Sequence, residues 1–454
     1  MNNPTELVTN LIKKGTDRSR IIKLNILYST AIKGISVLTS FLLVPITLRY
    51  LGTEDYGIWL TLSSVISWFA FFDMGIGNGL RNLFSEAVTL KNLKLAKTYV
   101  STAYVGLGIV LILSALLFLL FNYFIDWNTL LNAPASRNYD LNNIAILIFT
   151  LFLFRMELKL ISIILLADQR AALSNIFEPL ANIISLIGIY LLTLSTTGSM
   201  ESFILVVSLS PVIVFLIATF YFFRKEYHEY SPSFKYFEIK HLRSLVSLSS
   251  KFFLIQIAVL VIFSTDNLII TRILGPQEVT IYNIAFKYFN IITMGFAIII
   301  IPFLPAFTEA YVKEDIQWIR NAIKKLLIVW MLIFVTVIAM IFLAKPFYEL
   351  WVGNKIQIPT LLNVMMAGFI LISTWNNIYV YFINSTGKIT VQVIGSLFAA
   401  IINIPLSIFL ARNLNMGSAG VILGTCISLF PGVIIGPLQY YKILNKTAKG
   451  LWSR

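Results

Sequence analysis

The chain has 454 residues, of which 58% are hydrophobic and 12% are charged. A soluble domain carries about 25% charged residues, so the composition excludes one and predicts a polytopic membrane protein. The net charge of +14 does not indicate nucleic-acid binding, because the basic residues lie between apolar runs without interleaved aromatic residues. The single cysteine, Cys426, excludes a disulfide framework, and His228 and His241 share one polar loop where solvation is favoured over metal binding.

In chain order, residues 1–24 form a basic amphipathic leader that is expected to lie on the inner leaflet. Twelve apolar runs of spanning length follow, near 25–48, 57–80, 98–121, 141–166, 172–194, 202–223, 248–270, 283–306, 322–344, 359–383, 389–411 and 417–441. With both termini placed in the cytoplasm, inner segments hold about four times as many lysines and arginines as outer loops. This bias predicts that both termini are cytoplasmic.

The longest cytoplasmic loop, 224–247, links two halves that are weakly similar. LGTEDYGIW at 51–59 aligns with LGPQEVTIY at 274–282, and Arg170 aligns with Lys388, at a nearly constant spacing of about 220 residues. Six spans repeated in one orientation are typical of transporters that bind substrate between their halves. We therefore predict an all-α fold with two six-helix bundles around a central cavity, at 25–223 and 248–441, and a basic cytoplasmic tail at 442–454.

The second run ends in FFDMGIGNGLRN, which contains the acid Asp73, three alternating glycines and Arg81. An aspartate within an apolar helix is costly in lipid and usually faces a bundle interior or a water-filled path. Asn78 and Arg81 lie three residues apart and share a helix face, while the glycines permit a close helix approach. Either a substrate path or a small-residue packing seam fits this pattern.

Two other runs carry charges at positions where lipid contact is unfavourable. Lys33 in the first run either faces a cavity or extends to the membrane interface. In the fourth run, Arg155 and Lys159 share a face, whereas Glu157 points elsewhere and is expected to pair with a lysine of a neighbouring helix. An internal ion pair without substrate contact is the alternative for this cluster.

The remaining intramembrane charges are Glu178, beside the helix-kinking Pro179, and Lys251, Asp266 and Lys287 in the second half. Interface snorkelling is the alternative for Lys251. Basic residues outnumber acidic ones in the whole set, which favours an anionic substrate such as a pyrophosphate-linked lipid. The predicted substrate-binding residues are Lys33, Asp73, Asn78, Arg81, Arg155, Lys159, Lys251 and Lys287, and the candidates for coupling or ion pairing are Asp73, Glu157, Glu178 and Asp266.

The chain resembles the multidrug/oligosaccharidyl-lipid/polysaccharide exporter superfamily. It is most similar to the Wzx-type polysaccharide flippases of O-antigen and capsule repeat units. PITLRYLGTEDYGIW at 45–59, FDMGIGNGLRNLFSEA at 72–87 and the twelve-run layout carry the resemblance. It implies alternating access, flipping of an undecaprenyl-pyrophosphate-linked oligosaccharide from the inner to the outer leaflet of the bacterial inner membrane, and coupling to H⁺ or Na⁺. Membrane lipids and other polysaccharide-assembly proteins are the further partners it implies.

Two other functions are weighed against the flippase. A cation-coupled multidrug antiporter of the same superfamily needs an acidic cavity, which the excess of basic residues disfavours. A membrane-embedded glycan polymerase or ligase needs catalytic groups on a sizeable outer loop. The largest outer loops, 122–140 and 345–358, offer no histidine and no suitably spaced carboxylates. We therefore expect a transporter without catalytic residues, a metal or another cofactor.

Overall fold

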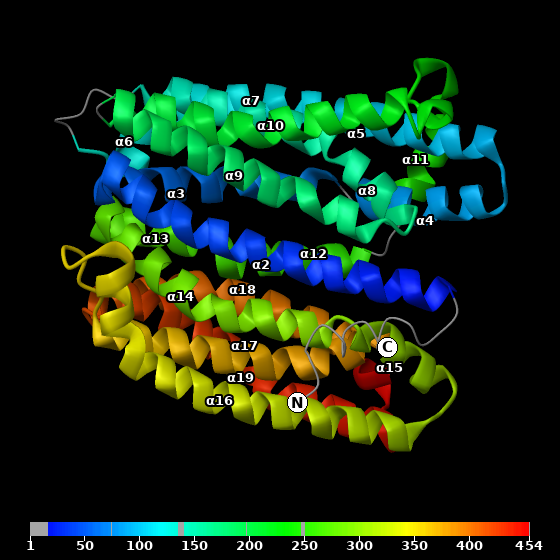
Figure 1. Ribbon diagram of the computed structural model, residues 1–454. Coiled ribbons are helices and arrows are strands. Elements are labelled where there is room, and N and C mark those ends of the chain that lie inside the picture. The colour runs from blue at the N-terminus through cyan, green and yellow to red at the C-terminus, as the bar shows by residue number, and fades with distance from the viewer. Residues whose placement is uncertain (1–16, 74, 135–139, 197, 247–249, 454) are drawn as a thin grey trace, which may run out of the picture. The chain divides into compact units, whose positions relative to one another are not determined.

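The computed structural model describes residues 17–453 apart from Met74, 135–139, Thr197 and 247–249 (Figure 1). Every regular element in this part of the chain is a helix, as the composition predicts. The chain divides into two compact units that are discontinuous in sequence. Unit 1 comprises Met1–Tyr50, Phe72–Phe124 and Asn142–Leu248, and unit 2 comprises Leu51–Phe71, Ile125–Leu141 and Ser249–Arg454.

Unit 1 is a bundle of long apolar helices joined by short turns. Its helices are α2 (Asp17–Leu51), α4 (Ile76–Thr89), α5 (Leu93–Phe124), α7 (Leu141–Leu158), α8 (Leu160–Ala167), α9 (Ala171–Ser195), α10 (Met200–Arg224) and α11 (Ile239–Val246), with short turns η2 (His228–Tyr230) and η3 (Phe234–Tyr236). On α5, Ile112, Leu116 and Tyr123 are 63%, 60% and 83% exposed. Such a large apolar face on one helix is suited to lipid rather than water.

Unit 2 is built in the same way and contains most of the second half of the chain. Its helices are α3 (Thr53–Ser67), α6 (Trp127–Leu130), α12 (Ser250–Ser264), α13 (Asp266–Leu274), α14 (Pro276–Ile300), α15 (Phe303–Val312), α16 (Ile316–Val352), α17 (Thr360–Thr386), α18 (Thr390–Ile408) and α19 (Gly417–Leu444); η1 (Trp68–Asp73) leads back to unit 1, and η4 (Phe409–Asn413) and η5 (Gly450–Ser453) are short. Aromatic residues fill part of its core, where the Phe307 ring meets the Phe382 ring edge to face with centroids 5.7 Å apart.

Ten helical segments in the described residues are long and apolar enough to cross a membrane. They coincide with ten of the twelve predicted runs. The second and fourth runs, 57–80 and 141–166, are each interrupted in the structure. The second becomes α3, η1 and α4, and the fourth becomes α7 and α8. These are the two runs whose polar clusters the sequence singles out.

Charged residues lie at three of the helix interruptions. Asp73 ends η1, and its Oδ1 accepts a hydrogen bond of 2.9 Å from the main-chain N–H of Gly75, which has a left-handed φ of 80°. Lys159 separates α7 from α8, and Asp266 begins α13 directly after the break that follows α12. Discontinuous helices with polar groups at their ends are characteristic of membrane transporters.

The internal repeat is visible in the backbone. Gly52 before α3 has φ 84° and ψ 177°, and Gly275 before α14 has φ 95° and ψ 165°. Only glycine adopts such angles readily, so both Leu-Gly pairs make the same turn into a helix. The shared turn supports the alignment of 51–59 with 274–282.

The two repeated segments also pack against each other. A Cβ on Gly57 of α3 would lie 1.7 Å from the Pro276 carbonyl oxygen of α14, and Thr280 Oγ1 donates to the Thr53 carbonyl at 2.6 Å. Residues Leu51–Phe71 therefore cluster with unit 2, although they precede most of unit 1 in sequence. The predicted sequential bundles, 25–223 and 248–441, stay a prediction.

The loop at 224–247 is a folded part of unit 1. Main-chain N–H groups of Ser233 and Glu238 donate to the Ser101 and Thr102 hydroxyls of α5 at 3.1 and 3.2 Å. Tyr227 donates from its hydroxyl to Asp168 Oδ2 at 2.6 Å, and burial together with this carboxylate raises the pKa of Tyr227 well above its usual range. The leader lies outside the described residues up to position 16.

Replacement of Gly79 with alanine is expected to destabilise unit 1. A Cβ at Gly79 of α4 would lie 2.1 Å from the Leu245 carbonyl oxygen of α11, so two backbones must separate. Overpacking of this kind costs about 1–3 kcal/mol. The yield of monodisperse protein after extraction should fall for Gly79→Ala. Gly34→Ala is the control, because a Cβ at Gly34 meets no atom within 4 Å. Equal yields would contradict the close approach of α4 and α11.

Candidate functional site: a basic pocket in unit 1

The candidate site is a pocket of about 280 Å³ within unit 1, lined by parts of α2, α8, α9 and α10 and by Lys159 at the break between α7 and α8. Its charged lining residues in the described part of the chain are Lys33, Lys159 and Glu178. Ser36, Ser162 and Ser174 add hydroxyl groups to the wall. Because α8 begins at Leu160, the Lys159 side chain projects from the interruption that divides the fourth predicted run.

Two cations hold the carboxylate of Glu178. Arg155 donates to both of its oxygens, at 2.9 and 2.7 Å, and Lys159 donates to Oε1 at 3.1 Å. The side chains of Arg155, Lys159 and Glu178 are 37%, 49% and 34% exposed. Solvent-accessible ion pairs of this kind contribute only about 0–1 kcal/mol to stability. Folding alone therefore does not explain why three charges converge here.

The local electrostatics favour an anion. Lys33, Arg155 and Lys159 bring three positive charges to a region where Glu178 supplies one negative charge. The Ser162 hydroxyl is buried in the pocket wall and has no hydrogen-bond partner among the described residues. Cationic and hydroxyl donors around one small space match phosphate oxygens, which accept strong charge-assisted hydrogen bonds.

The structure brings together four of the predicted site residues and leaves others outside the pocket. Lys33, Lys159 and Glu178 line the pocket, and Arg155 joins them through its ion pair with Glu178, on the helix face that it shares with Lys159. The α4 residues Asn78 and Arg81 are exposed and are not among its lining residues.

Asp73 has a local structural role at the start of α4 through its bond to Gly75. The α4 helix packs against the pocket wall, because a Cβ on Gly77 would lie 2.6 Å from Ile163 Cδ1. Gly77 therefore lies in a packing seam, while Asn78 and Arg81 of the same helix are exposed.

The carboxylate of Glu157 differs from its expected arrangement. A Cβ on Gly108 of α5 would lie 3.8 Å from Glu157 Oε1, so the side chain turns toward α5 and away from Glu178. Its Oε2 is buried and has no hydrogen-bond partner in the described part of the chain. Among the described residues, no ion pair joins Glu157 to a lysine of a neighbouring helix, because its carboxylate faces Gly108 of α5.

Three predicted site residues belong to unit 2. Asp266 is 4% exposed, and its Oδ2 accepts a hydrogen bond from the Tyr282 hydroxyl at 2.6 Å. Its Oδ1 is buried without a partner among the described residues. Lys287 is half-buried on α14. The side chain of Lys251 lies outside the described residues.

Ser174 and Asn175 on α9 also line the pocket, although the sequence prediction did not include them. They precede Glu178 by four and three residues, so helical spacing places all three on one face. Ser174 donates from its hydroxyl to the Ser162 carbonyl at 2.8 Å, which ties α9 to α8. The described residues contain no group of three His, Cys, Asp or Glu side chains able to hold a metal ion.

Comparisons with known proteins agree with this fold. Two curated relatives are a putative O-antigen export protein of Yersinia pseudotuberculosis, 25% identical over 87% of this chain and 90% of that protein, and a putative O-antigen transporter of Salmonella typhimurium, 24% identical over 87% and 91%. The fold is similar to an inward-facing multidrug resistance MATE family transporter of the MOP superfamily, with a TM-score of 0.74, 13% identity and coverage of 93% and 100%.

A second solved structure is the lipid II flippase MurJ in its inward closed conformation, with a TM-score of 0.68, 15% identity and coverage of 93% and 90%. These two likenesses establish the helical fold. The family model described as polysaccharide biosynthesis protein matches residues 22–311, more than half of the chain. The chain therefore belongs to the polysaccharide biosynthesis protein family.

Proposed function

We propose that this protein is a flippase for a lipid-linked oligosaccharide, with undecaprenyl pyrophosphate as the lipid carrier. The basic pocket of unit 1 carries the proposal, because it offers cations and hydroxyl donors suited to a pyrophosphate. Two relatives, named as a putative O-antigen export protein and a putative O-antigen transporter, and the similarity of the fold to that of a lipid II flippase support the same function. In this proposal the protein transports the glycan and does not synthesise it.

The chemistry of binding follows from the pocket geometry. Lys33 and Lys159 provide mobile ammonium groups, and Arg155 is positioned beside them by its two bonds to Glu178. When a pyrophosphate enters, Lys159 can exchange its bond to Glu178 for one to a phosphate oxygen. Glu178 keeps Arg155 as a partner during this exchange, so the carboxylate is never left uncompensated.

Alternating access then moves the headgroup across the membrane, and an ion gradient supplies the energy. We assign coupling to the carboxylates Asp73, Glu157, Glu178 and Asp266, with H⁺ or Na⁺ as the ion. Glu157 and Asp266 support this assignment, because each has a buried oxygen without a hydrogen-bond partner among the described residues. Uptake of a proton removes the charge of such a buried carboxylate, and a bound cation gives the unpartnered oxygen a ligand.

The multi-pass chain is a membrane protein, and we place it in the bacterial inner membrane with both termini in the cytoplasm. The excess of lysine and arginine in the predicted inner segments supports this orientation. Polysaccharide-assembly proteins that make or extend the glycan are the further partners we propose. A multidrug antiporter shares the fold, but a pocket with more cations than carboxylates disfavours a cationic substrate.

Inorganic pyrophosphate tests the assignment of the pocket. We expect wild-type protein in lipid nanodiscs to bind it, and Lys159→Gln to bind it about tenfold more weakly because one charge-assisted hydrogen bond is lost. Isothermal titration calorimetry measures both affinities. Lys94→Gln removes an exposed lysine outside the pocket and should bind as the wild type does. Equal losses in both variants would show that binding reflects general surface charge.

A further inference from the structure

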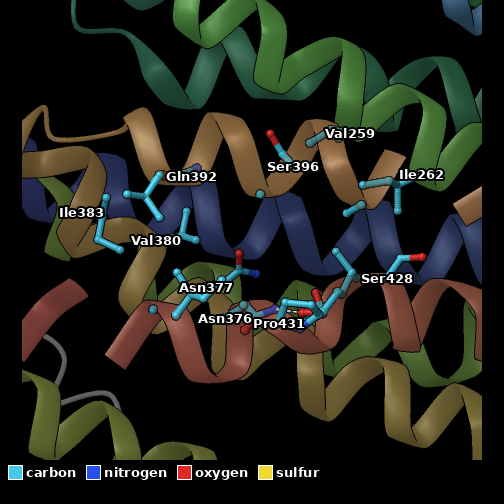
Figure 2. Close-up of a pocket in the computed structure, with 18 of the residues that line it drawn as sticks. Val259, Ile262, Asn376, Asn377, Val380, Ile383, Gln392, Ser396, Ser428 and Pro431 are labelled. Carbon is cyan, nitrogen blue, oxygen red and sulfur yellow. Dashed lines mark hydrogen bonds between the residues drawn. The ribbon is translucent and has the colours of Figure 1, made fainter. Parts of the chain in front are cut away.

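Unit 2 contains a second cavity with a different chemistry. It has a volume of about 240 Å³ and lies among α12, α17, α18 and α19 (Figure 2). None of its lining residues in the described part of the chain is charged. Its polar lining consists of amides and hydroxyls, including Asn376, Asn377, Gln392, Ser396 and Ser428. Figure 2 shows Gln392 from α18 and Asn377 from α17 extending into the same space.

Four polar side chains of this cavity donate to main-chain carbonyls of the protein. Asn376 Nδ2 donates to the Leu429 carbonyl at 3.0 Å, and Gln439 Nε2 donates to the Lys388 carbonyl at 2.7 Å. The hydroxyls of Ser396 and Ser428 donate to main-chain carbonyls of their own helices, at 2.9 and 2.8 Å. The two serine hydroxyls therefore retain only acceptor lone pairs for a ligand, and each of the two amides retains its oxygen and one N–H.

Two amide oxygens in the cavity wall are left without partners. Asn376 Oδ1 and Gln392 Oε1 are buried and have no hydrogen-bond partner among the described residues. The bond from Asn376 Nδ2 to Leu429 fixes the orientation of that amide, because a carbonyl accepts only from the nitrogen end. A Cβ on Gly432 would lie 2.8 Å from Asn376 Nδ2, so this glycine lets α19 approach the amide closely.

The cavity therefore suits a neutral polar group that can donate hydrogen bonds to the two amide oxygens. An organic cation lacks a carboxylate partner among the described lining residues, and a phosphate lacks a cation. A hydrocarbon chain would leave the two amide oxygens unsatisfied. Hydroxyl and acetamido N–H groups of a sugar match the acceptors, and the volume is below the range of about 300–1,000 Å³ that is usual for drug-sized ligands.

We propose that this cavity binds one sugar ring of the transported glycan, through hydrogen bonds from the sugar to Asn376, Gln392 and the serine hydroxyls. The inference rests on the proposed flippase function and adds a second subsite to it. The basic pocket of unit 1 binds the pyrophosphate, and the neutral cavity of unit 2 binds the carbohydrate.

Free sugars test this subsite independently of the phosphate. Wild-type protein in nanodiscs is titrated with glucose, galactose and N-acetylglucosamine, and binding is measured by saturation-transfer NMR. We expect at least one of the three to bind. Gln392→Leu replaces the amide with an apolar side chain of similar size. This variant should bind that sugar about tenfold more weakly. Absence of binding by all three sugars to the wild type overturns the proposal.

Glycine substitutions provide a blocking variant with a matched control. A Cβ at Gly395 on α18 meets no atom within 4 Å, so Gly395→Leu can fold while its side chain fills the cavity. Gly368 on α17 is equally unhindered but is not among the cavity residues. Sugar binding should be lost in Gly395→Leu and kept in Gly368→Leu. Binding that persists in Gly395→Leu contradicts the site.

Inorganic pyrophosphate separates this inference from the function on which it rests. Both glycine variants and Gln392→Leu should bind pyrophosphate as the wild type does, since the basic pocket belongs to unit 1. If the sugar binds at Gly395 but pyrophosphate does not bind the wild type, the proposed function fails at its anionic site. If pyrophosphate binds and Gly395→Leu leaves sugar binding unchanged, only the carbohydrate subsite fails.

Discussion

Lys159→Ala is expected to abolish glycan export while leaving folded protein in the membrane. Lys159 lines the basic pocket and its side chain is 49% exposed, so its removal takes away a charge available to substrate. Glu178 keeps both hydrogen bonds from Arg155 in this variant, so the fold loses only about 0–1 kcal/mol. Surface glycan in a deletion strain that carries the variant measures the effect.

A paired set of variants distinguishes substrate binding from an internal ion pair. Lys33→Ala removes a second lining lysine and should also prevent export, whereas Lys94→Ala affects an exposed lysine elsewhere and should complement fully. Arg155→Ala should lower export too, because Glu178 then competes for Lys159. Normal export by both Lys33→Ala and Lys159→Ala would show that the pocket does not contact the substrate.

Locking α3 to α13 is expected to stop transport completely. Thr61 Oγ1 and Thr271 Oγ1 are fully buried and 2.6 Å apart, so cysteines at the two positions can form a disulfide. α3 comes from the first half of the sequence repeat and α13 from the second, although both lie in unit 2, and we expect the contact between them to rearrange during part of the transport cycle. Thr61→Cys with Thr271→Cys, in a Cys426→Ala background, should lose export after oxidation and regain it after reduction.

The single variant Thr61→Cys in the same background is the control for oxidative damage and should remain active. Electrophoresis after cleavage between the two positions measures how much disulfide has formed. A fully formed disulfide with undiminished export would mean that α3 stays with α13 throughout the cycle. That result would restrict the moving parts to elements other than α3 and α13.

Composition and the lengths of the apolar runs predict the helical class and the spans. The alignment of 51–59 with 274–282 predicts the repeat. The sequence also predicts the convergence of Arg155 and Lys159, because their spacing of four residues defines one helix face. It does not predict Glu178 as their common partner, since that contact joins residues 23 positions apart on different helices. The interruption at Lys159 has no local signal, because neither glycine nor proline lies there.

The break after Asp73 is different, because the local sequence Asp-Met-Gly explains it. A carboxylate two residues before a glycine can accept from the glycine N–H, and Gly75 takes the left-handed conformation that this turn needs. Hydrophobicity predicts one continuous span at 57–80, because the first part of this run is strongly apolar. The packing of α3 with α14 depends on Gly57 meeting a backbone oxygen of a distant helix, which sequence alone does not reveal.

Reconstitution tests the central claim most directly. Purified protein in proteoliposomes is supplied with the undecaprenyl-pyrophosphate-linked glycan that accumulates in the deletion strain, labelled on one leaflet. Appearance of the glycan on the opposite leaflet is followed with a membrane-impermeant glycan-specific reagent. We predict movement with the wild type and with Lys94→Ala, and none with Lys159→Ala. No movement by the wild type, together with transport of a cationic dye, would contradict the flippase account and favour a multidrug antiporter.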